Sequence, residues 1–250
     1  MKLFYSVVKR FNRVFRPEYS VVERQGVRLL LNKNNWIDNR LLSFRRYEAE
    51  NLAFILRHLQ TGVYNRFIDI GANIGFFTAQ ALKNSPVERV MSFEPMSNNF
   101  YHLGANVLMN RGCKQVNIYP YALDRQRGKS VIHYDVNSTG IGTLRPDSGV
   151  RDIMDYTHQE EIECRCFDDE FEIAGETLFI KIDVEQFEAE ALRGMQTLFE
   201  KNQILLIVEI NTPNSEAFQI LKSFGMMQIL CMGEDYVFTN FDYEKVSGLC

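Results

Sequence analysis

The segment RFIDIGANIGFF, residues 66–77, begins as a buried strand and then places two glycines and an asparagine where a helix should start. Glycine permits positive φ, and it lacks the Cβ that would keep a ligand away from backbone N–H groups. In an open α/β sheet, ligands bind beyond the carboxyl ends of the strands, often at the first strand-to-helix turn. Gly71 and Gly75 therefore predict a pocket for a nucleotide-like group at this turn.

Apolar strand patterns alternate with amphipathic helix patterns along most of the 250 residues. This alternation is typical of a mostly parallel sheet that helices cover on both faces, and the length suits one domain. We expect strands near 67–70, 89–93, 116–120, 178–183, 204–210, 227–231 and 236–239. We expect helices near 47–59, 75–84, 97–110, 186–201 and 215–224.

Two parts of the chain depart from this alternation. Residues 19–31 read as two short strands around Gln25-Gly26. Residues 127–166 contain two β-like runs, SVIHY and IECRC, separated by a loop rich in glycine, serine and aspartate. We therefore divide the chain into an N-terminal extension, residues 1–46, and an α/β domain, residues 47–250, which carries a small β insertion.

A carboxylate follows the second strand of the alternating region. Glu94 lies in the motif SFEP, about 23 residues beyond Gly71, where a carboxylate can accept both hydroxyl protons of a ribose. A dinucleotide-binding turn would need glycines at positions 71, 73 and 76, whereas this chain has Asn73 and Phe76. This departure counts against NAD. Each motif alone could equally be a tight turn or a solvated carboxylate, but together they favour a cofactor.

The composition describes a globular protein without a general affinity for nucleic acid. Lys and Arg number 28 against 32 Asp and Glu, which gives a net charge of −4. The five cysteines are odd in number and lack zinc-binding spacing, so they predict reduced thiols in a cytoplasmic protein. No apolar run approaches the roughly 20 residues of a membrane span. The sequence also offers no specific oxygen-ligand spacing, and we predict no metal.

Residues 1–16 have an amphipathic helical pattern. Apolar side chains from Leu3 to Phe15 share one face, five basic residues lie opposite, and residues 1–17 contain no acid. Charges interrupt any signal-type apolar region, so the segment does not predict secretion. Such a helix either makes peripheral contact with an anionic membrane or packs on the domain or on a partner subunit of a homo-oligomer.

Several motifs occur in the order and spacing of a known family. They are FIDIGANIGFFT, SFEPMSNNFYHLGANVLMN, YPYALDRQRG, CRCFDDEF, IKIDVEQFEAEALRGM and ILLIVEI, with YEAEN similar to the family's upstream helix. Over roughly residues 44–212, the chain resembles the FkbM-type S-adenosylmethionine-dependent methyltransferases. Several separated motifs in one order are far more specific than a single glycine turn.

The resemblance implies a class I methyltransferase fold, with a Rossmann-like sheet of seven strands whose last strand is antiparallel, and S-adenosylmethionine as cofactor. The matching cofactor-binding positions are Asp69, Gly71, Asn73, Gly75, Thr78, Glu94, Ala122 and Asp124. By this resemblance Thr78 lies near the methionine moiety and Glu94 binds the ribose. By the same resemblance, Ala122 and Asp124 lie where such proteins commonly contact the edge of the adenine ring.

Carboxylates gather at the ends of two later strands. Asp183 and Glu185 follow from the strand LFIKID, and Glu209 ends the next strand at the same sheet edge. Such carboxylates favour a nearby sulfonium, and one can accept the proton of an attacking hydroxyl. We predict Asp183 and Glu185 as catalytic residues, with an N-cap role as the alternative for Asp183. His133, in the inserted β-like run, is a reserve base.

The acceptor is less well specified than the cofactor. The family usually has glycine after DVE, whereas this chain has Gln186, whose side chain would narrow or alter the acceptor cleft. We predict O-methylation of a sugar hydroxyl in a bacterial surface glycan or a glycosylated natural product. The alternatives are a small-molecule carboxyl or polyketide hydroxyl as acceptor, a nucleotide-sugar oxidoreductase, and a non-catalytic cofactor-binding protein.

Overall fold

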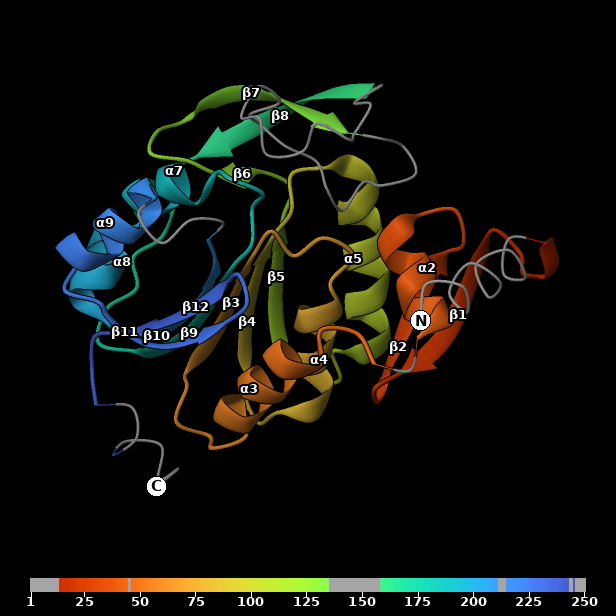
Figure 1. Cartoon of the computed structure of the whole chain (residues 1–250), viewed down its shortest axis with the longest axis horizontal. Helices are drawn as coiled ribbons and strands as arrows, with labels where there is room; N and C mark the ends of the chain where they lie inside the picture. The colour runs from red at the N-terminus through yellow and green to blue at the C-terminus, as the bar shows by residue number, and fades with distance from the viewer. Residues whose placement is uncertain (1–13, 45, 135–157, 211–214, 243–244, 246–250) are drawn as a thin grey trace.

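Seven strands form the central sheet of the computed structural model, which describes residues 14–44, 46–134, 158–210, 215–242 and 245 (Figure 1). They are β3 (Arg66–Ile70), β4 (Arg89–Phe93), β5 (Gln115–Tyr119), β9 (Thr177–Ile182), β10 (Gln203–Glu209), β11 (Met227–Met232) and β12 (Asp235–Thr239). Their order is β11-β12-β10-β9-β3-β4-β5. β12 is antiparallel to both neighbours, and the pairs from β10 to β5 are parallel. This topology confirms the predicted seven-stranded sheet with an antiparallel last strand.

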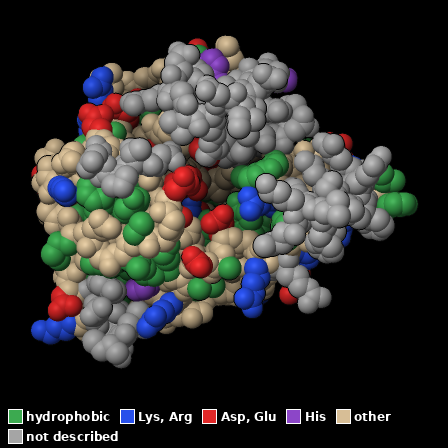
Figure 2. All heavy atoms as spheres, in the orientation of Figure 1, with side chains coloured by type: hydrophobic (Ala, Val, Ile, Leu, Met, Phe, Trp, Pro, Cys, Tyr) green, Lys and Arg blue, Asp and Glu red, His purple; other side chains and the backbone are tan. Residues whose placement is uncertain are grey.

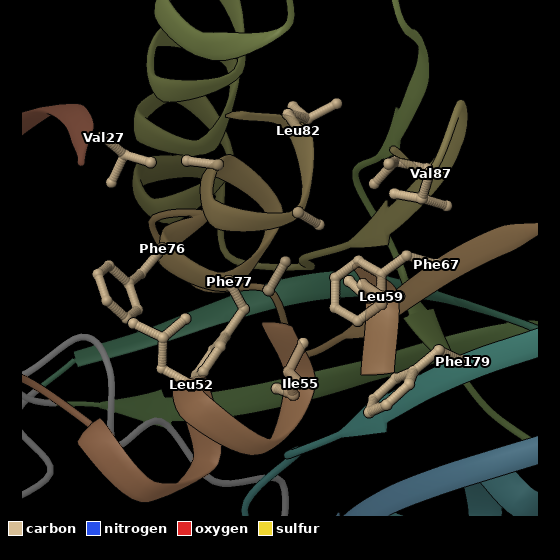
Figure 3. Close-up of a cluster of buried hydrophobic side chains, with 14 of the residues drawn as sticks. Val27, Leu52, Ile55, Leu59, Phe67, Phe76, Phe77, Leu82, Val87 and Phe179 are labelled. Carbon is tan, nitrogen blue, oxygen red and sulfur yellow. The ribbon is translucent and has the colours of Figure 1, made fainter. Parts of the chain in front are cut away.

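Helices cover both faces of the sheet (Figure 1). On one face lie α3 (Ala49–Leu59), α4 (Phe76–Asn84) and α5 (Ser97–Asn110), and on the other α7 (Glu188–Arg193), α8 (Gln196–Lys201) and α9 (Glu216–Ser223). Because side chains alternate along a strand, Phe67 packs into the first core and Ile68 into the second. Figure 3 shows part of the first core, with Phe67 and Phe179 of the sheet close to Leu59 of α3.

The N-terminal extension packs into the first of these cores. β1 (Tyr19–Arg24) and β2 (Val27–Asn32) form the predicted antiparallel hairpin. Alternate β2 residues, including Val27 and Leu31, are fully buried. Asn106 of α5 fixes the hairpin, since its Oδ1 accepts a hydrogen bond from the Leu30 amide at 2.7 Å. The hairpin and the α/β domain therefore share one hydrophobic core.

A helix that the sequence analysis did not predict, α2 (Trp36–Ser43), follows the hairpin. Asn35 caps its N-terminus, and the Asn35 Oδ1 accepts a hydrogen bond from the Ile37 amide at 3.0 Å. The carboxylate of Asp38 is fully buried and accepts a hydrogen bond from the Asn32 amide at 2.7 Å. Burial raises the pKa of Asp38 to about 7. The Asp38 contact anchors α2 to the end of the hairpin.

The inserted segment contributes two strands to a separate three-stranded sheet, drawn near the top of Figure 1, and the third strand comes just before it in the chain. The strands of this sheet are β6 (Ala122–Leu123), β7 (Gly128–Tyr134) and β8 (His158–Arg165), in the order β6-β8-β7. β7 and β8 pair in antiparallel fashion, which confirms the two predicted β-like runs. The residues between β7 and β8 lie outside the described part of the chain.

The prediction of a single helix near 186–201 is wrong, because α7 and α8 are separate helices that meet at Gly194 and Met195. At Gly194 the backbone passes so close to Asp124 that an added Cβ would lie 2.2 Å from the Asp124 carbonyl oxygen. Asp168, in the short helix α6 (Phe167–Glu170), then caps α8, and its Oδ2 accepts a hydrogen bond from the Thr197 amide at 2.6 Å. Contacts from distant segments thus interrupt a pattern that is locally helical.

The predicted amphipathic segment lies almost wholly outside the described residues. Contact of residues 1–16 with a membrane or a partner subunit therefore stays a prediction. At its end, Val14 and Phe15 have 67% and 71% of their surface exposed. Across the described ranges, no helix has the length and apolarity needed to cross a membrane. Four of the five cysteines fall in these ranges, and all four are free thiols.

We expect substitution of Gly71 to destabilise the fold more than a positive φ alone explains. Gly71 has a φ of +77°, and an added Cβ would lie 1.8 Å from the carbonyl oxygen of Asp183. Gly71→Ala should lower the free energy of unfolding by more than about 3 kcal/mol, because backbone overlap adds to left-handed strain.

Gly175→Ala is the matched control for this substitution. Gly175 has a φ of +70°, but no atom lies within 4 Å of an added Cβ. It should therefore lose only about 1–2 kcal/mol. Urea denaturation measures both free energies, and equal losses would contradict the expected backbone overlap at Gly71.

Candidate active site

A cavity of about 340 Å³ lies where the carboxyl ends of β3, β4, β9 and β10 meet. Figure 2 shows a hollow near the centre of one face, with acidic and basic side chains around it. Ligand pockets typically have volumes of about 300–1,000 Å³, and those of open α/β sheets lie at this edge. The cavity is therefore the candidate active site, in the place that the glycine turn predicts.

The glycine turn after β3 forms one side of the cavity. Gly71 and Asn73 line it, whereas Gly75 does not. Gly75 has a φ of +80°, and an added Cβ would lie 2.5 Å from Leu103 Cδ1, so this glycine lets α5 pack close to the turn. Asn73 also has a positive φ, +52°, which asparagine tolerates better than most residues. The two glycines are thus required by the close packing of the fold as well as by access of a ligand.

Glu94 is buried beside the turn and lines the cavity. Its Oε2 accepts a hydrogen bond from the Asn73 amide at 2.8 Å, and its Oε1 accepts one from the Met96 amide at 3.0 Å. Oε1 also lies 3.5 Å from Asn99 Nδ2, a long contact that a ligand hydroxyl can replace, and Oε2 keeps a second lone pair, so each oxygen can accept one donor from a ligand. Burial raises the pKa of Glu94 to about 7, although these amide hydrogen bonds oppose the shift. The geometry fits a carboxylate that accepts two neighbouring hydroxyl protons.

An apolar wall lies next to Glu94. Tyr121, Ala122 and Leu123, at and before β6, and Ile132 of β7 line this part of the cavity. Ala122 thus lines the cavity, and its predicted place beside adenine stays a prediction. A planar, largely apolar group such as a nucleobase fits between side chains of this kind.

Two predicted residues in this region do not line the cavity. Asp124 Oδ1 accepts a hydrogen bond from the Arg125 amide at 2.6 Å, which ties its carboxylate to the following turn. His133 alternates with Ile132 along β7, and because Ile132 faces the cavity, His133 points to the opposite face of that strand. The structure therefore offers no support for His133 as a base or for Asp124 as an adenine ligand.

Asp69 and Thr78 lie behind the cavity wall instead of lining it. Both are almost fully buried, and the Thr78 hydroxyl donates a hydrogen bond to Asp69 Oδ2 at 2.6 Å. The same hydroxyl lies 2.8 Å from Ser92 Oγ. This network joins β3, β4 and α4, so Thr78 supports the turn and makes no direct contact with the cavity.

Asp183 and Lys181 form an ion pair at the end of β9. Lys181 Nζ lies 2.9 Å from Asp183 Oδ2 and 4.8 Å from the centroid of the Phe77 ring. Burial alone would lower the pKa of Lys181, but the carboxylates of Asp183 and Asp69 outweigh burial and raise it. Both members of the pair line the cavity. Lys181 holds one oxygen of Asp183, which leaves the other to accept a proton from a ligand.

Further carboxylates surround this pair. Those that line the same cavity are Glu48, Glu185, Glu209, Glu234 and Asp235. Asp235 Oδ2 accepts a hydrogen bond from Asn51 Nδ2 at 2.6 Å. Burial, together with the negative charges of Asp183 and Glu185, raises the pKa of Glu209 to about 9. Within the described ranges, no three His, Cys, Asp or Glu side chains are arranged to hold a metal ion.

The turn after β9 contains two residues with left-handed backbone, Glu185 at φ +50° and Gln186 at φ +76°. Glu188 stabilises this turn, since its Oε1 accepts a hydrogen bond from the Gln186 amide at 2.9 Å. Burial raises the pKa of Glu188 to about 7. Gln186 itself does not line the cavity, so the structure does not support the predicted narrowing of the cleft. Glycine at position 186 would chiefly relieve backbone strain.

One side of the cavity, which the sequence did not predict, consists of Trp36, Ile37, Arg40 and Tyr47, and we call it the N-terminal wall. The first three belong to α2, and Tyr47 packs edge-on against Phe76 at a centroid distance of 5.4 Å. Asn35, just before Trp36, is the kind of residue that commonly begins a helix, so the sequence did contain a signal for α2. No local pattern, however, indicates that this helix reaches the sheet edge.

The chain is similar to several known proteins. A family model, the methyltransferase FkbM domain, matches residues 69–239. A stretch of 90 residues, 35% of this chain, is 34% identical to the AMB antimetabolite synthetase AmbE of Pseudomonas aeruginosa, of which it covers 4%. The solved methyltransferase FkbM of Methylobacillus flagellatus is 16% identical, with a TM-score of 0.48 over 70% of this chain and 43% of that one. TYW2 of M. jannaschii, solved in complex with AdoMet, is 10% identical, with a TM-score of 0.45 over 90% and 84% of the two chains.

The raised pKa of Glu209 predicts a pH dependence of stability. Its value of about 9 in the folded protein exceeds the ordinary value of 4.5, so the folded state binds more protons between these pH values. The free energy of unfolding should therefore fall as pH rises through this window. Between pH 7 and pH 9, Glu209→Gln should show a smaller fall in melting temperature than the wild-type protein. Glu200→Gln, an exposed change on α8, should keep the wild-type slope. An unchanged slope for Glu209→Gln would contradict the assignment.

Proposed function

Since this chain belongs to the FkbM family of S-adenosylmethionine-dependent methyltransferases, we propose that it methylates a sugar hydroxyl in a bacterial surface glycan or its lipid-linked precursor. Membership of the family makes the protein an enzyme with S-adenosylmethionine as cofactor. It favours a methyltransferase over the nucleotide-sugar oxidoreductase and the non-catalytic protein that were the alternatives. The observation that carries the sugar assignment is the carboxylate-rich end of the cavity around Asp183.

The cofactor fits the part of the cavity between the glycine turn and the apolar wall. Glu94 has the buried position and the remaining lone pairs needed to accept both ribose hydroxyl protons. Ala122 and Leu123 offer an apolar surface for adenine, and Gly71 with Asn73 borders the space left for the methionine moiety. We assign these residues to cofactor binding. Asp69, Gly75 and Thr78 support the turn from behind.

The carboxylates favour a neutral hydroxyl acceptor over an acceptor carboxylate. An anionic acceptor would have to ionise beside Asp183, Glu185 and their neighbours, which like charges disfavour. A sugar hydroxyl, by contrast, can donate to an ionised carboxylate and accept from a protonated one such as Glu209.

In this reaction Asp183 is the residue that takes the proton. When bound, S-adenosylmethionine supplies a methyl group on a sulfonium sulfur, which keeps the electron pair of the broken C–S bond as the acceptor oxygen forms the new C–O bond. Lys181 fixes one oxygen of Asp183, and the other accepts the hydroxyl proton from the acceptor. Glu185 lies at the same end of the cavity and contributes negative charge near the reacting cation.

A small natural product is a second candidate acceptor. The similarity to part of an antimetabolite synthetase favours it, because the name of that protein indicates the synthesis of a small molecule. The carboxylate-rich cavity suits a hydroxyl of such a molecule for the same electrostatic reason. The same negative charges disfavour methylation of a carboxyl group of that molecule.

Binding of S-adenosylhomocysteine should depend on the ionisation of Glu94. Because the ionised carboxylate accepts both ribose protons and its pKa is about 7, affinity should fall several-fold as pH drops from 7 to 6. Glu94→Gln should bind more weakly and lose this pH dependence. Glu88→Gln, an exposed change just before the same strand, should behave like the wild-type protein. Calorimetric titration at several pH values measures these affinities, and a wild-type profile for Glu94→Gln would refute the ribose assignment.

Methylation of a glycan should depend on Asp183. Cells that lack the gene should produce surface glycans lighter by one methylene per methylated sugar, and the wild-type gene should restore the mass. Asp183→Asn should fail to restore it, whereas Asp169→Asn, an exposed change on α6, should succeed. Mass spectrometry of the released glycans and their lipid-linked precursors reads the outcome. Identical masses with and without the gene would count against the glycan and favour the small-molecule acceptor.

A further inference from the structure

Arg40 presents an uncommitted guanidinium to the cavity. Its Cζ lies 4.7 Å from the centroid of the Trp36 ring, four residues earlier on the same face of α2. Both side chains are half-buried and line the cavity. Within the described ranges, no carboxylate forms an ion pair with Arg40, and its side chain donates no hydrogen bond to a protein oxygen. Stacking on Trp36 thus orients the guanidinium and leaves its N–H donors available to a ligand.

The other cation that lines the cavity in the described part of the chain is already paired. Lys181 is buried, and Asp183 lies 2.9 Å from its ammonium group. Of these two cations, Arg40 is therefore the one that can pair with an anionic group of a ligand. A guanidinium also matches a carboxylate better than an ammonium does, because its N–H donors form a fork that can bind both carboxylate oxygens.

The N-terminal wall meets the glycine turn at Tyr47, whose ring packs on Phe76, the first residue of α4 after the turn. The charges of Arg40 and Asp183 both act on Tyr47 and Glu48, so Arg40 lies between the turn and the end of the cavity near Asp183. Arg40 and the carboxylate of Glu48 thus set charges of opposite sign at this end of the cavity. Such a pair suits a group that itself carries one negative and one positive charge, as an α-amino acid does.

We propose that Arg40 binds the α-carboxylate of the methionine moiety of S-adenosylmethionine, with Trp36 holding the guanidinium in place. With Glu94 on the ribose, the cofactor would then be held at both polar ends, by residues from opposite parts of the chain. This role depends on the cofactor alone and is independent of the identity of the acceptor.

Two ligands that differ by a single carboxylate test this role. S-adenosylhomocysteine carries the α-carboxylate, and its decarboxylated analogue, S-adenosyl-3-thiopropylamine, keeps the amine and the nucleoside. Calorimetry should show that Arg40→Met weakens binding of S-adenosylhomocysteine by about 10- to 100-fold, as expected for loss of a charged hydrogen-bond pair. The same variant should bind the decarboxylated analogue as the wild-type protein does. Arg40→Lys should fall between, because a point charge replaces the fork.

Arg28→Met is the matched control, since it removes one positive charge from an exposed position on β2. It should bind both ligands with wild-type affinity, and melting temperatures should verify that all variants are folded. If Arg40→Met is poorly folded, the comparison rests on Arg40→Lys, which keeps the charge. If Arg40→Met loses the same affinity for both ligands, Arg40 only shapes the cavity. If its affinity for S-adenosylhomocysteine is unchanged, Arg40 does not bind the α-carboxylate. Either result would overturn the proposal.

Discussion

The close backbone contact between Gly71 and Asp183 is the constraint on which the site depends. The carbonyl oxygen of Asp183 occupies the space that a Cβ on residue 71 would need, and the Asp183 amide donates a hydrogen bond to the Ile70 carbonyl at 3.0 Å. The Gly71 amide in turn donates to the Phe93 carbonyl, one residue before Glu94. The ends of β3, β4 and β9 are therefore locked together. As a result, the carboxylate assigned to the ribose and the carboxylate assigned to the proton lie at fixed positions on one sheet edge.

The electrostatics of the cavity are consistent with a ligand that brings positive charge. Several carboxylates share one end of the cavity. Among the residues that the structure describes, Lys181 contributes the one ammonium group there, and Asp183 already pairs with it. Burial and neighbouring negative charges leave Glu209 protonated at neutral pH. A nearby sulfonium would favour ionisation of these groups, because opposite charges lower the pKa of a carboxyl. The strain of Glu48, Asn73 and Glu185, which have left-handed backbone and line the cavity, agrees with a functional site, where such conformations cluster.

Much of the fold could be predicted because its signals are local. Apolar strands such as residues 66–70 and the glycine turn after them carry their own pattern, and the alternation of strands and helices specifies a parallel sheet. Glu94 and Asp183 could be placed for the same reason, since each follows a strand that ends at the sheet edge. The misses depend on distant contacts. Asp168 and Asp124 interrupt a helical pattern near Gly194, and the alternation of β7 turns Ile132 instead of His133 toward the cavity. Motif matching located Asp69 and Thr78 but could not distinguish a supporting residue from one that contacts the ligand.

The N-terminal wall shows why the site cannot be understood from the methyltransferase domain alone. The family match begins at residue 69, whereas α2 and Tyr47 precede it and still line the cavity. Their position is set by contacts with elements inside the match: Asn106 of α5 holds the hairpin, and the hairpin, through Asn32 and Asp38, holds α2. The helix thus inherits the rigidity of the central core without belonging to the sheet. The side chains of α2 that line the cavity, Trp36, Ile37 and Arg40, are only half-buried and lie outside the sheet, so ligand contacts on this wall depend less on the strands that position Glu94 and Asp183.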